Sequence, residues 1–532
     1  GGELKNDNTL SSTYTVRAGF NYFKRLHETH EIDVNVGSEA RSVKYDGIST
    51  VQRGYLPDRG KKFVAINAAE WPLYNEWLMA NPDVVVDRLT NVVSFYGTFT
   101  YTYDDRYTAN FNIRTDGSNK FGQDKSTKFL PVWSAAVRWN IHNESFMQDF
   151  GWLQRLKLRA STGYTGSQNF NSYQAISTYK YYSDEVYDNI IGSYLMSLAN
   201  PDLQWQKTQD NNVGLDLSIF GRVDLTFDYY IKNTSNLLTP VTLPPSAGFS
   251  SYTENLGKSQ NKGFELQASV RAINNSDQDL HLNVFASLMH NTNKIKEINE
   301  ALSSMNDSKD SDKGLNYDQN TKEKTTKPSV RYAEGQSMSA IWAVRSLGID
   351  PGTGNELFLT KDGYLTYTWD SDDQIVCGDE LPKYTGTFGF NLDWKGFSVN
   401  TSFYYRLGGQ MYNQTLVDKV ENCDMNYNVD HRVYTGRWTT PGQKAEFKKM
   451  TDPNYFTRPT SRFVQDLSEL QMTSLNIGYD FRNCKFMQKG IIERLKLSFY
   501  MNDVFRLSTV KTERGTDYPF ARSFSFQLQA TF

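Results

Sequence analysis

The chain of 532 residues lacks any uninterrupted apolar stretch of the length that a membrane-spanning helix needs, about 20 residues. No run of about 18 or more apolar residues exists, so helical membrane spans are excluded, whereas the mean hydropathy of -0.60 is compatible with spanning strands that keep half their residues in water. A strong charge of either sign is also absent, because 57 Lys and Arg balance 60 Asp and Glu to a net charge of -3. This balance gives no electrostatic footprint for nucleic acid, and that class of partner is set aside.

Cysteine is scarce, with three residues at Cys377, Cys423 and Cys484. An odd number cannot pair completely within one chain. Two alternatives stay open: a Cys377–Cys423 bridge between loops on the same predicted side, or free thiols. No secretory signal stands at Gly1, so we expect the chain to start inside a longer product.

Aromatic residues are abundant, at 14% with 33 Tyr and 32 Phe. The last ten residues, Ser523–Phe532, alternate strictly, with Phe524, Phe526, Leu528 and the final Phe532 each separated by polar neighbours. In a pleated strand this pattern places one row of side chains in lipid and the other in a watery lumen. The segment is typical of the closing strand of an outer-membrane barrel.

Segments of this kind recur along the whole chain, each about ten residues long, as a tilted strand needs to cross the hydrocarbon. They include Tyr14–Tyr22, Tyr107–Arg114, Val223–Lys232, Phe264–Ala272, Leu280–Leu288, Phe388–Trp394, Phe397–Tyr405 and Leu495–Met501. Counting them gives about fifteen strands. The pattern predicts an all-β fold, a transmembrane antiparallel β-barrel.

The connections between these segments alternate between short and long. Short turns include 104–106, 220–222 and 395–396, whereas long loops are expected near 43–91, 166–208, 293–383 and 406–468. Bacterial barrels place short turns in the periplasm and long loops outside the cell. This rule orients the predicted barrel, and residues 68–80 are expected to form a short helix within the first long loop.

The odd strand number predicts an open sheet, with residues 1–12 expected in an extracellular loop. Backbone groups left bare at two sheet edges in lipid would cost several kcal/mol each. We therefore expect preceding strands, supplied by another segment of the same gene product, to complete the barrel.

Several longer sequence motifs go beyond periodicity. They are RTDGSNKFG at Arg114–Gly122, FLPVWSAAVRWNIHNESFM at Phe129–Met147, LKLRASTGYTGSQN at Leu156–Asn169, NPDLQWQKTQDNNVGLDLSIF at Asn200–Phe220, DYYIKNTSNLLTPVTLPPSAGFSSYTENLGKSQNKGFEL at Asp228–Leu266, GIDPGTGNE at Gly348–Glu356, RWTTPG at Arg437–Gly442, SRFVQDLSELQM at Ser461–Met472 and YPFARSFSFQLQATF at Tyr518–Phe532. In this order, and over nearly the whole chain, they resemble the SusC/RagA family of TonB-dependent outer-membrane transporters.

The resemblance implies a barrel of about 22 strands closed around an N-terminal plug, of which residues 1–532 would supply the C-terminal part, about 15 strands, without the plug. It implies a multi-pass protein of the outer membrane of a Gram-negative bacterium that imports oligosaccharides or peptides. The implied partners are a SusD-like surface lipoprotein that covers the mouth, TonB acting through the missing plug, and the N-terminal part of the barrel.

Other functions stay open beside this one. A passive porin or an adhesin barrel is the first alternative, and a secreted soluble all-β glycan-binding protein is the second. Enzymatic activity is not expected, because His27–His30 lacks the spacing of a zinc-protease helix and no nucleophile motif is present.

Binding of oligosaccharide cargo would need aromatic faces for stacking in loops and lumen. The candidates are Trp71, Trp77, Tyr173, Tyr179, Tyr181, Tyr182, Trp205, Tyr252 and Trp342. The competing interpretation is that these rings pack loops together or lie at the membrane interface. Ionisable residues in the lumen-facing row are expected to pair inside the wall or with the plug more often than to contact cargo; they are Arg17, Asp33, Arg114, Arg138, Asp216, Asp224, Asp228, Glu265 and Asp393.

No cofactor or metal is predicted, with one weaker alternative. Asp370, Asp372, Asp373 and Asp379 gather acidic oxygens in one long loop, where they could hold Ca²⁺. Ile375 stands where an EF-hand loop needs glycine, so a solvated acidic loop is favoured.

Overall fold

A computed structural model describes residues 2–67, 69–119, 129–167, 178–184, 190–197, 205–242, 251–255, 257–298, 326–424, 426, 428–450, 456–484, 492–511 and 522–532. One antiparallel sheet of 16 strands dominates it. The strands follow one another in chain order: β1 (Gly2–Leu26), β2 (His30–Leu56), β4 (Val84–Tyr103), β5 (Tyr107–Ser118), β6 (Phe129–Asn140), β7 (Leu153–Ser167), β10 (Gln206–Ile219), β11 (Val223–Ser235), β14 (Lys258–Asn275), β15 (Leu280–Glu297), β20 (Tyr384–Trp394), β21 (Phe397–Tyr412), β22 (Val464–Asp480), β23 (Arg494–Ser508) and β24 (Phe524–Thr531). The short β3 (Lys62–Phe63) pairs with β2.

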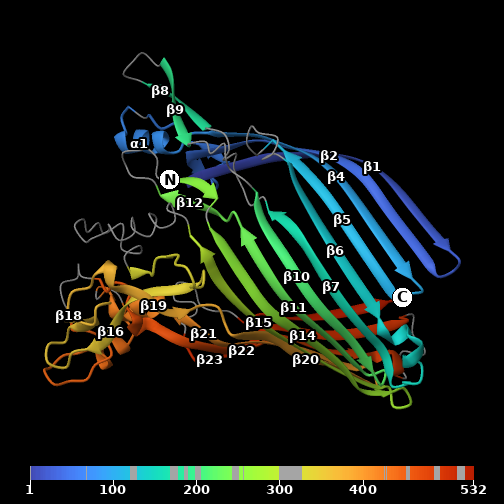
Figure 1. The fold of residues 1–532 in the computed structure, drawn as a ribbon. Helices are drawn as coiled ribbons and strands as arrows, with labels where there is room; N and C mark the ends of the chain where they lie inside the picture. The colour runs from blue at the N-terminus through green and yellow to red at the C-terminus, as the bar shows by residue number, and fades with distance from the viewer. Residues whose placement is uncertain are drawn as a thin grey trace.

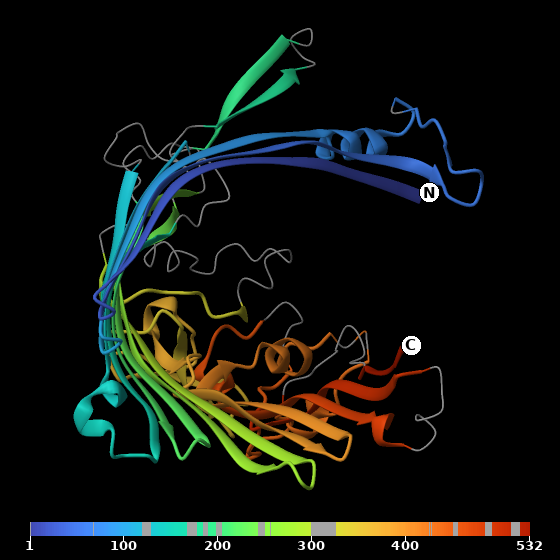
Figure 2. The ribbon, with the colours of Figure 1, turned by 90° about the vertical axis from the view of Figure 1, so that its right-hand side faces the viewer.

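The sheet curves into an arc whose two edges are β1 and β24, as Figures 1 and 2 show. The path of the arc contains the expected number of strands, and the predicted all-β barrel architecture is confirmed. Among the described residues no helix combines the length and the apolar character that crossing a membrane would require.

The smaller elements lie in the connections. They are α1 (Pro72–Ala80), η1 (Ile141–Asn143), η2 (Ser145–Met147), β8 (Thr178–Asp184), β9 (Ile190–Ser197), β12 (Leu238–Thr242), β13 (Ser251–Asn255), β16 (Ala340–Ile349), β17 (Glu356–Leu359), β18 (Leu365–Thr366), η6 (Ser371–Asp373), β19 (Gln374–Asp379), α5 (Gln414–Leu416), η7 (Val417–Glu421), α6 (Arg432–Thr435), η8 (Ser461–Phe463) and η9 (Phe481–Asn483). Helix α1 confirms the predicted helix in the first long loop.

Short hairpin turns fall where the alternation predicts them. Tyr103 pairs with Tyr107 around the turn 104–106, and Trp394 pairs with Phe397 around 395–396. Asp104 takes a φ of 51°, the left-handed geometry that tight hairpin turns use. These turns gather at one end of the strands, the periplasmic end under the predicted orientation.

Two expectations about the start of the chain are wrong. Residues 2–12 are not a loop, because β1 pairs with β2 from Gly2 onward. The loop expected near 43–91 is strand up to Leu56 and again from Val84. The prediction relied on the alternation of apolar residues, which is needed only where a strand contacts lipid. The hydrogen-bonded strands themselves continue beyond the membrane into water, where that alternation ends. The other three long loops also lose a few residues at their ends to the flanking strands.

The apolar rows of the barrel strands face outward. Phe95 and Phe99 in β4, a strand paired on both sides, are 53% and 44% exposed, although both belong to its apolar row. A soluble sandwich would bury this row, whereas a membrane barrel presents it to lipid. The exposed apolar row therefore excludes a soluble β-sandwich.

A belt of aromatic rings crosses the wall at its periplasmic end. His30 and Tyr103 lie 5.0 Å apart between ring centroids, Tyr103 and Tyr107 6.5 Å, and Tyr107 and Trp139 6.2 Å. The Tyr107 hydroxyl and the Trp139 indole both donate to the Glu144 carboxylate, at 2.5 and 2.9 Å. Such rings mark the boundary between lipid and water.

The outward orientation can be tested by charge insertion. Leu215, near the middle of the outward row of β10, changed to Arg should destabilise the barrel by about 2–4 kcal/mol, because the charge would face hydrocarbon. The control is Thr226→Arg on the neighbouring strand, in the concave row, where an arginine meets water and carboxylates. Urea unfolding in lipid vesicles measures both variants; equal losses would contradict the assigned faces.

Candidate functional site

Paired charges line the concave face of the sheet. The Arg159 guanidinium in β7 bonds Asp216 in β10 at 3.0 Å and Asp228 in β11 at 3.2 Å, so one cation joins three strands. Arg17 bonds Glu39 through its Nε at 2.8 Å on the first hairpin. This face is polar and internally neutralised, which suits a conduit for polar cargo.

The expectation that lumen-row charges pair with one another is confirmed for several positions. Arg114 bonds Asp116 and the Ser94 hydroxyl, each at 2.8 Å, and Arg271 lies 3.6 Å from Asp224. Near the outer end, Glu469 bonds both Arg406 and Arg506. These groups stabilise the wall rather than stand ready for a ligand.

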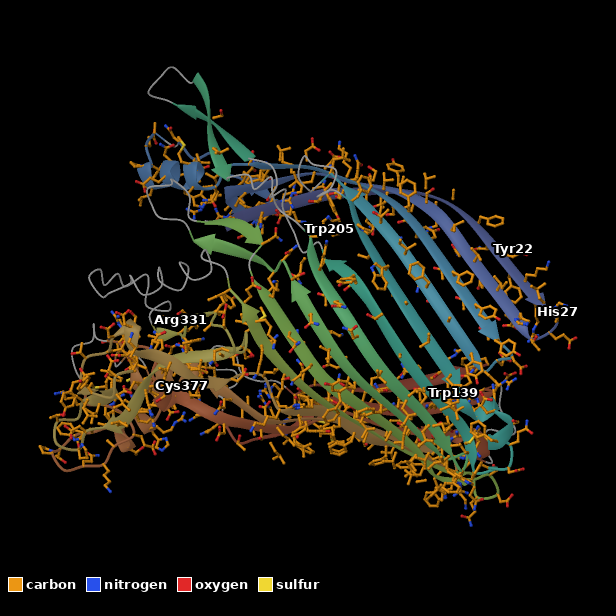
Figure 3. The ribbon with its side chains drawn as sticks, viewed as in Figure 1. Tyr22, His27, Trp139, Trp205, Arg331 and Cys377 are labelled. Atoms are coloured by element: carbon orange, nitrogen blue, oxygen red, sulfur yellow. The ribbon has the colours of Figure 1, made fainter. Side chains whose placement is uncertain are left out.

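A folded cap lies at the extracellular end, on the concave side of the arc (Figure 2). We define it as residues 326–383 and 413–463, with Arg331 and Cys377 labelled in Figure 3. Its core consists of Ile341, Val417, Val420, Val433, Phe447 and Phe463, and Tyr412 at the end of wall strand β21 packs with them. This hydrophobic cluster of buried residues therefore lies mostly in the cap, beside the conduit.

An ionic centre joins the two halves of the cap. Arg462 bonds Glu356 at 3.0 Å and Glu421 at 2.7 Å, and Thr460 donates to Glu356 at 2.6 Å. The side chains of Arg462, Glu356 and Glu421 are 12%, 5% and 0% exposed. Burial opposes the charge of Arg462, but the two carboxylates outweigh it and raise the pKa of Arg462 above its ordinary value.

A second buried arginine fixes the chain path around this centre. Arg437 donates to the carbonyl oxygens of Val420, Glu421, Val433 and Lys448 at 2.6–3.0 Å. Five N–H donors in a rigid fork let one arginine satisfy carbonyls from three segments. No carboxylate is needed for this role.

The third junction is a turn held by an aromatic ring. Asp350 accepts from Gly352 N and the Thr353 hydroxyl at 2.9 and 2.7 Å, and the indole of Trp438 donates to Pro351 O at 2.9 Å. Gly354 has a φ of 71°, and a Cβ there would lie 2.4 Å from the Trp438 ring. Only glycine fits this contact.

These three junctions join three motifs that lie far apart in the sequence. GIDPGTGNE contributes Glu356, RWTTPG contributes Arg437 and Trp438, and SRFVQDLSELQM contributes Arg462. The sequence did not identify these residues as a cluster. Their position within the sequence motifs quoted for the resemblance was the available signal.

Lys448 is buried beside the same centre. Burial lowers the pKa of Lys448 to about 8. The nearby carboxylates of Glu421 and Glu356 raise the pKa, while repulsion from Arg462 and Arg437 lowers it further. Its protonation state therefore changes close to neutral pH.

The predicted cargo-binding aromatics do not gather at one place. Trp71 is 63% exposed next to α1, and Trp77 on α1 lies beneath the Arg53 guanidinium, 4.3 Å from its ring centroid. Trp205 is 6% exposed at the outer end of β10 (Figure 3), so its ring has little surface for cargo. Trp342 lies half-buried in β16.

Five further candidates cannot be placed as side chains. Tyr179, Tyr181 and Tyr182 belong to β8 and Tyr252 belongs to β13, while Tyr173 lies outside the described residues.

The acidic loop is organised as turns. Asp370 accepts from Asp372 N at 3.0 Å, Asp373 from Lys361 N at 3.0 Å, and Asp379 from the Ser339 hydroxyl at 2.6 Å. Within the described ranges no group of three or more His, Cys, Asp or Glu side chains is arranged to hold a metal ion.

The cysteines are free thiols, so the alternative of a Cys377–Cys423 bridge is wrong. Cys377 lies on β19, where its thiol donates to Ala343 O at 3.4 Å and burial raises its pKa. The strand pairing of β16 with β19 fixes this position independently of Cys423.

The outward apolar row, the paired concave row and the aromatic belt define the chain as an outer-membrane β-barrel. Residues 2–415 match the family described as TonB dependent receptor-like, beta-barrel, and the chain belongs to this family. The resemblance to SusC/RagA transporters seen in the sequence motifs is confirmed.

Curated relatives and solved structures agree with this assignment. TonB-dependent receptor P3 of Formosa agariphila is 28% identical over 77% of this chain, and TonB-dependent receptor SusC of Bacteroides thetaiotaomicron is 26% identical over 83%. The RagAB peptide importer in its closed-closed state superimposes with a TM-score of 0.78 over 96% of this chain, at 21% identity. The chain spans 40% and 44% of the two relatives and 53% of the solved chain.

Removal of the central cation should open the cap. Arg462→Met leaves two buried carboxylates without their partner and should cost about 3–5 kcal/mol of local stability. Hydrogen exchange of residues 340–349 measures the opening. Arg345→Met, an exposed arginine of the same cap, is the matched control. The triple variant R462M/E356Q/E421Q should recover much of the loss; if it does not, the ionic centre is not the cause.

Lys448 makes cap stability depend on pH. Because its folded pKa of about 8 lies below the ordinary 10.5, the unfolded cap binds the proton more tightly between these values. The free energy of unfolding should rise by roughly 3 kcal/mol as pH increases through this window, and stay at its lower level below about pH 8, where both states hold the proton. Lys448→Met should abolish the rise and stabilise the cap at pH 7.

Urea unfolding of the cap, followed by tryptophan fluorescence between pH 7 and 11, measures this dependence. Lys361→Met, an exposed lysine of the cap, should keep the wild-type profile. A flat wild-type profile would contradict the role given to Lys448.

Proposed function

We propose that this chain forms the C-terminal portion of the barrel of a SusC-like TonB-dependent importer of oligosaccharides or peptides. The observation that carries the proposal is the folded cap at the mouth of a wall whose concave face is polar. A passive porin needs only an open, wet lumen. A cap with its own hydrophobic core and buried ionic centre offers a rigid surface at the entrance, on which a gate can act.

The proposal assigns separate tasks to the parts of the molecule. The concave wall, with its charges already paired, passes polar cargo without binding it tightly. The cap limits access from outside and presents the surface beside which a SusD-like lipoprotein lid operates. Energy from TonB acts through a plug that residues 1–532 do not include, and strands paired to the free edges of β1 and β24 complete the barrel. No enzymatic step and no resident cofactor are part of this proposal.

Both cargo classes fit a polar, neutralised wall. The name of the RagAB structure speaks of a peptide importer, and the likeness in fold favours peptides as one class to test. The exposed Trp71 leaves oligosaccharides as the other class to test, because sugar rings stack on aromatic faces.

Transport can be tested in a strain that lacks the gene. We expect the strain to lose growth on one class of purified oligosaccharide or peptide, and the full-length gene to restore it. Uptake of labelled cargo should stop when a protonophore removes the proton gradient, as active import requires. Uptake that continues would support a passive porin, and unchanged growth on every polymer would contradict nutrient import.

A further inference from the structure

An apolar groove of about 390 Å³ runs over the outer, convex face of the wall, across β6, β7, β10 and β11. Figure 1 looks onto this face. The floor is formed by the small side chains of Ala135 and Ala160, and larger outward residues stand around it: Val137, Val213, Tyr229 and Ile231. Two alanines at neighbouring outward positions thus make a depression where most outward side chains are bulky.

The outer end of the groove is polar. Thr162 and Asn211 are opposite each other on β7 and β10, and the Thr162 hydroxyl donates to the Asn211 side-chain oxygen at 2.7 Å. Because the oxygen of the Asn211 side chain accepts this bond, the NH₂ group of the same amide is the hydrogen-bond donor at this depth of the groove. Polar side chains on the lipid face are costly without acceptors, which an ester, amide or hydroxyl group of a lipid would supply.

Two cations stand near the polar pair, one beyond it and one beside it. In β10 the outward row changes from Leu215 and Val213 to Asn211 and Gln209, and then to the exposed Lys207. Lys262 of β14, also exposed, pairs across the strands with Ile231 at the edge of the groove. Lys207 therefore lies two outward positions beyond Asn211 toward the extracellular end, whereas Lys262 shares the register of Asn211 across β11.

The level of the boundary is marked independently by aromatic rings. Trp133 in the outward row of β6 and Tyr164 in the outward row of β7 lie 5.7 Å apart between ring centroids. Tyr164 is the next outward residue after Thr162 in β7. Rings in this position are typical of the lipid–water interface. The groove therefore descends from the outer interface into the hydrocarbon.

We propose that this groove binds an acylated, phosphate-bearing lipid of the outer leaflet. One acyl chain lies over Ala135 and Ala160, its carbonyl or hydroxyl accepts from Asn211, and Lys207 and Lys262 face the phosphate. The occupant follows from continuity with the lipid-facing surface and from the order of apolar, hydrogen-bonding and cationic groups along the groove. This order repeats the order of groups in such a lipid from tail to head.

Lipid retention tests the site in the full-length transporter, without any need to know its cargo. The protein is extracted from outer membranes, exchanged into fresh detergent, and its bound lipid is quantified by mass spectrometry and phosphate assay. The wild type should retain the lipid. A135L/A160L, which fills the groove, and K207Q/K262Q, which removes the cations, should each lower retention about tenfold or more.

Two controls keep the outcome specific. Ala286→Leu changes an outward alanine of β15 that does not line the groove, and Lys395→Gln removes a lysine at the periplasmic turn. Both should retain the lipid. Heat-dependent migration in gels verifies that each barrel is folded; the surface change K207Q/K262Q remains informative if the groove-filling variant fails to fold.

Three results would overturn the proposal: no lipid retained by the wild type, equal retention in all variants, or loss in Ala286→Leu as well. Loss in Lys395→Gln but not in K207Q/K262Q would place the lipid in the periplasmic leaflet and would also overturn it.

Discussion

The wall depends on one constraint: backbone N–H and C=O groups in hydrocarbon have no water to bond and must bond one another. Along the path from β1 to β24 a continuous antiparallel ladder meets it, and each strand of this path pairs with the next one on the path. Once the ladder is fixed, the two-residue period of side chains decides which row meets lipid and which faces the lumen. Polar and charged residues on the concave face then pair across strands, as Arg159 does with Asp216 and Asp228.

The cap follows the opposite rule because it stands in water. There the backbone can bond solvent, so stability requires a dry core, and the cap has one around Val417, Val420 and Phe463. Its buried charges are compensated at short range, with Arg462 between two carboxylates and Arg437 among carbonyl oxygens. Such a unit offers a rigid entrance, anchored to the wall where Tyr412 of β21 joins its core.

Much of the fold could be predicted, because every second residue of a membrane-spanning strand contacts lipid and must be apolar. The outward rows and the tight turns, such as 104–106 and 395–396, are local signals and fall where expected. The extent of β1 and β2 could not be predicted, since the ladder continues beyond the membrane, where the outward row turns polar. The fate of Cys377 and Cys423 was also beyond sequence reasoning, because each thiol is placed by strands and turns remote from the other.

The candidate site was the least predictable part. Glu356, Arg437 and Arg462 are ordinary charged residues in their own segments, and only their approach across the cap makes them a buried centre. The membrane-facing architecture follows from the sequence alone, since the alternation of apolar and polar residues that lipid requires is a pattern among neighbouring residues. Tertiary structure alone decided the cap, its ionic centre and the lipid-facing groove, because these arise where strands and loops distant in the chain meet and change one another's burial.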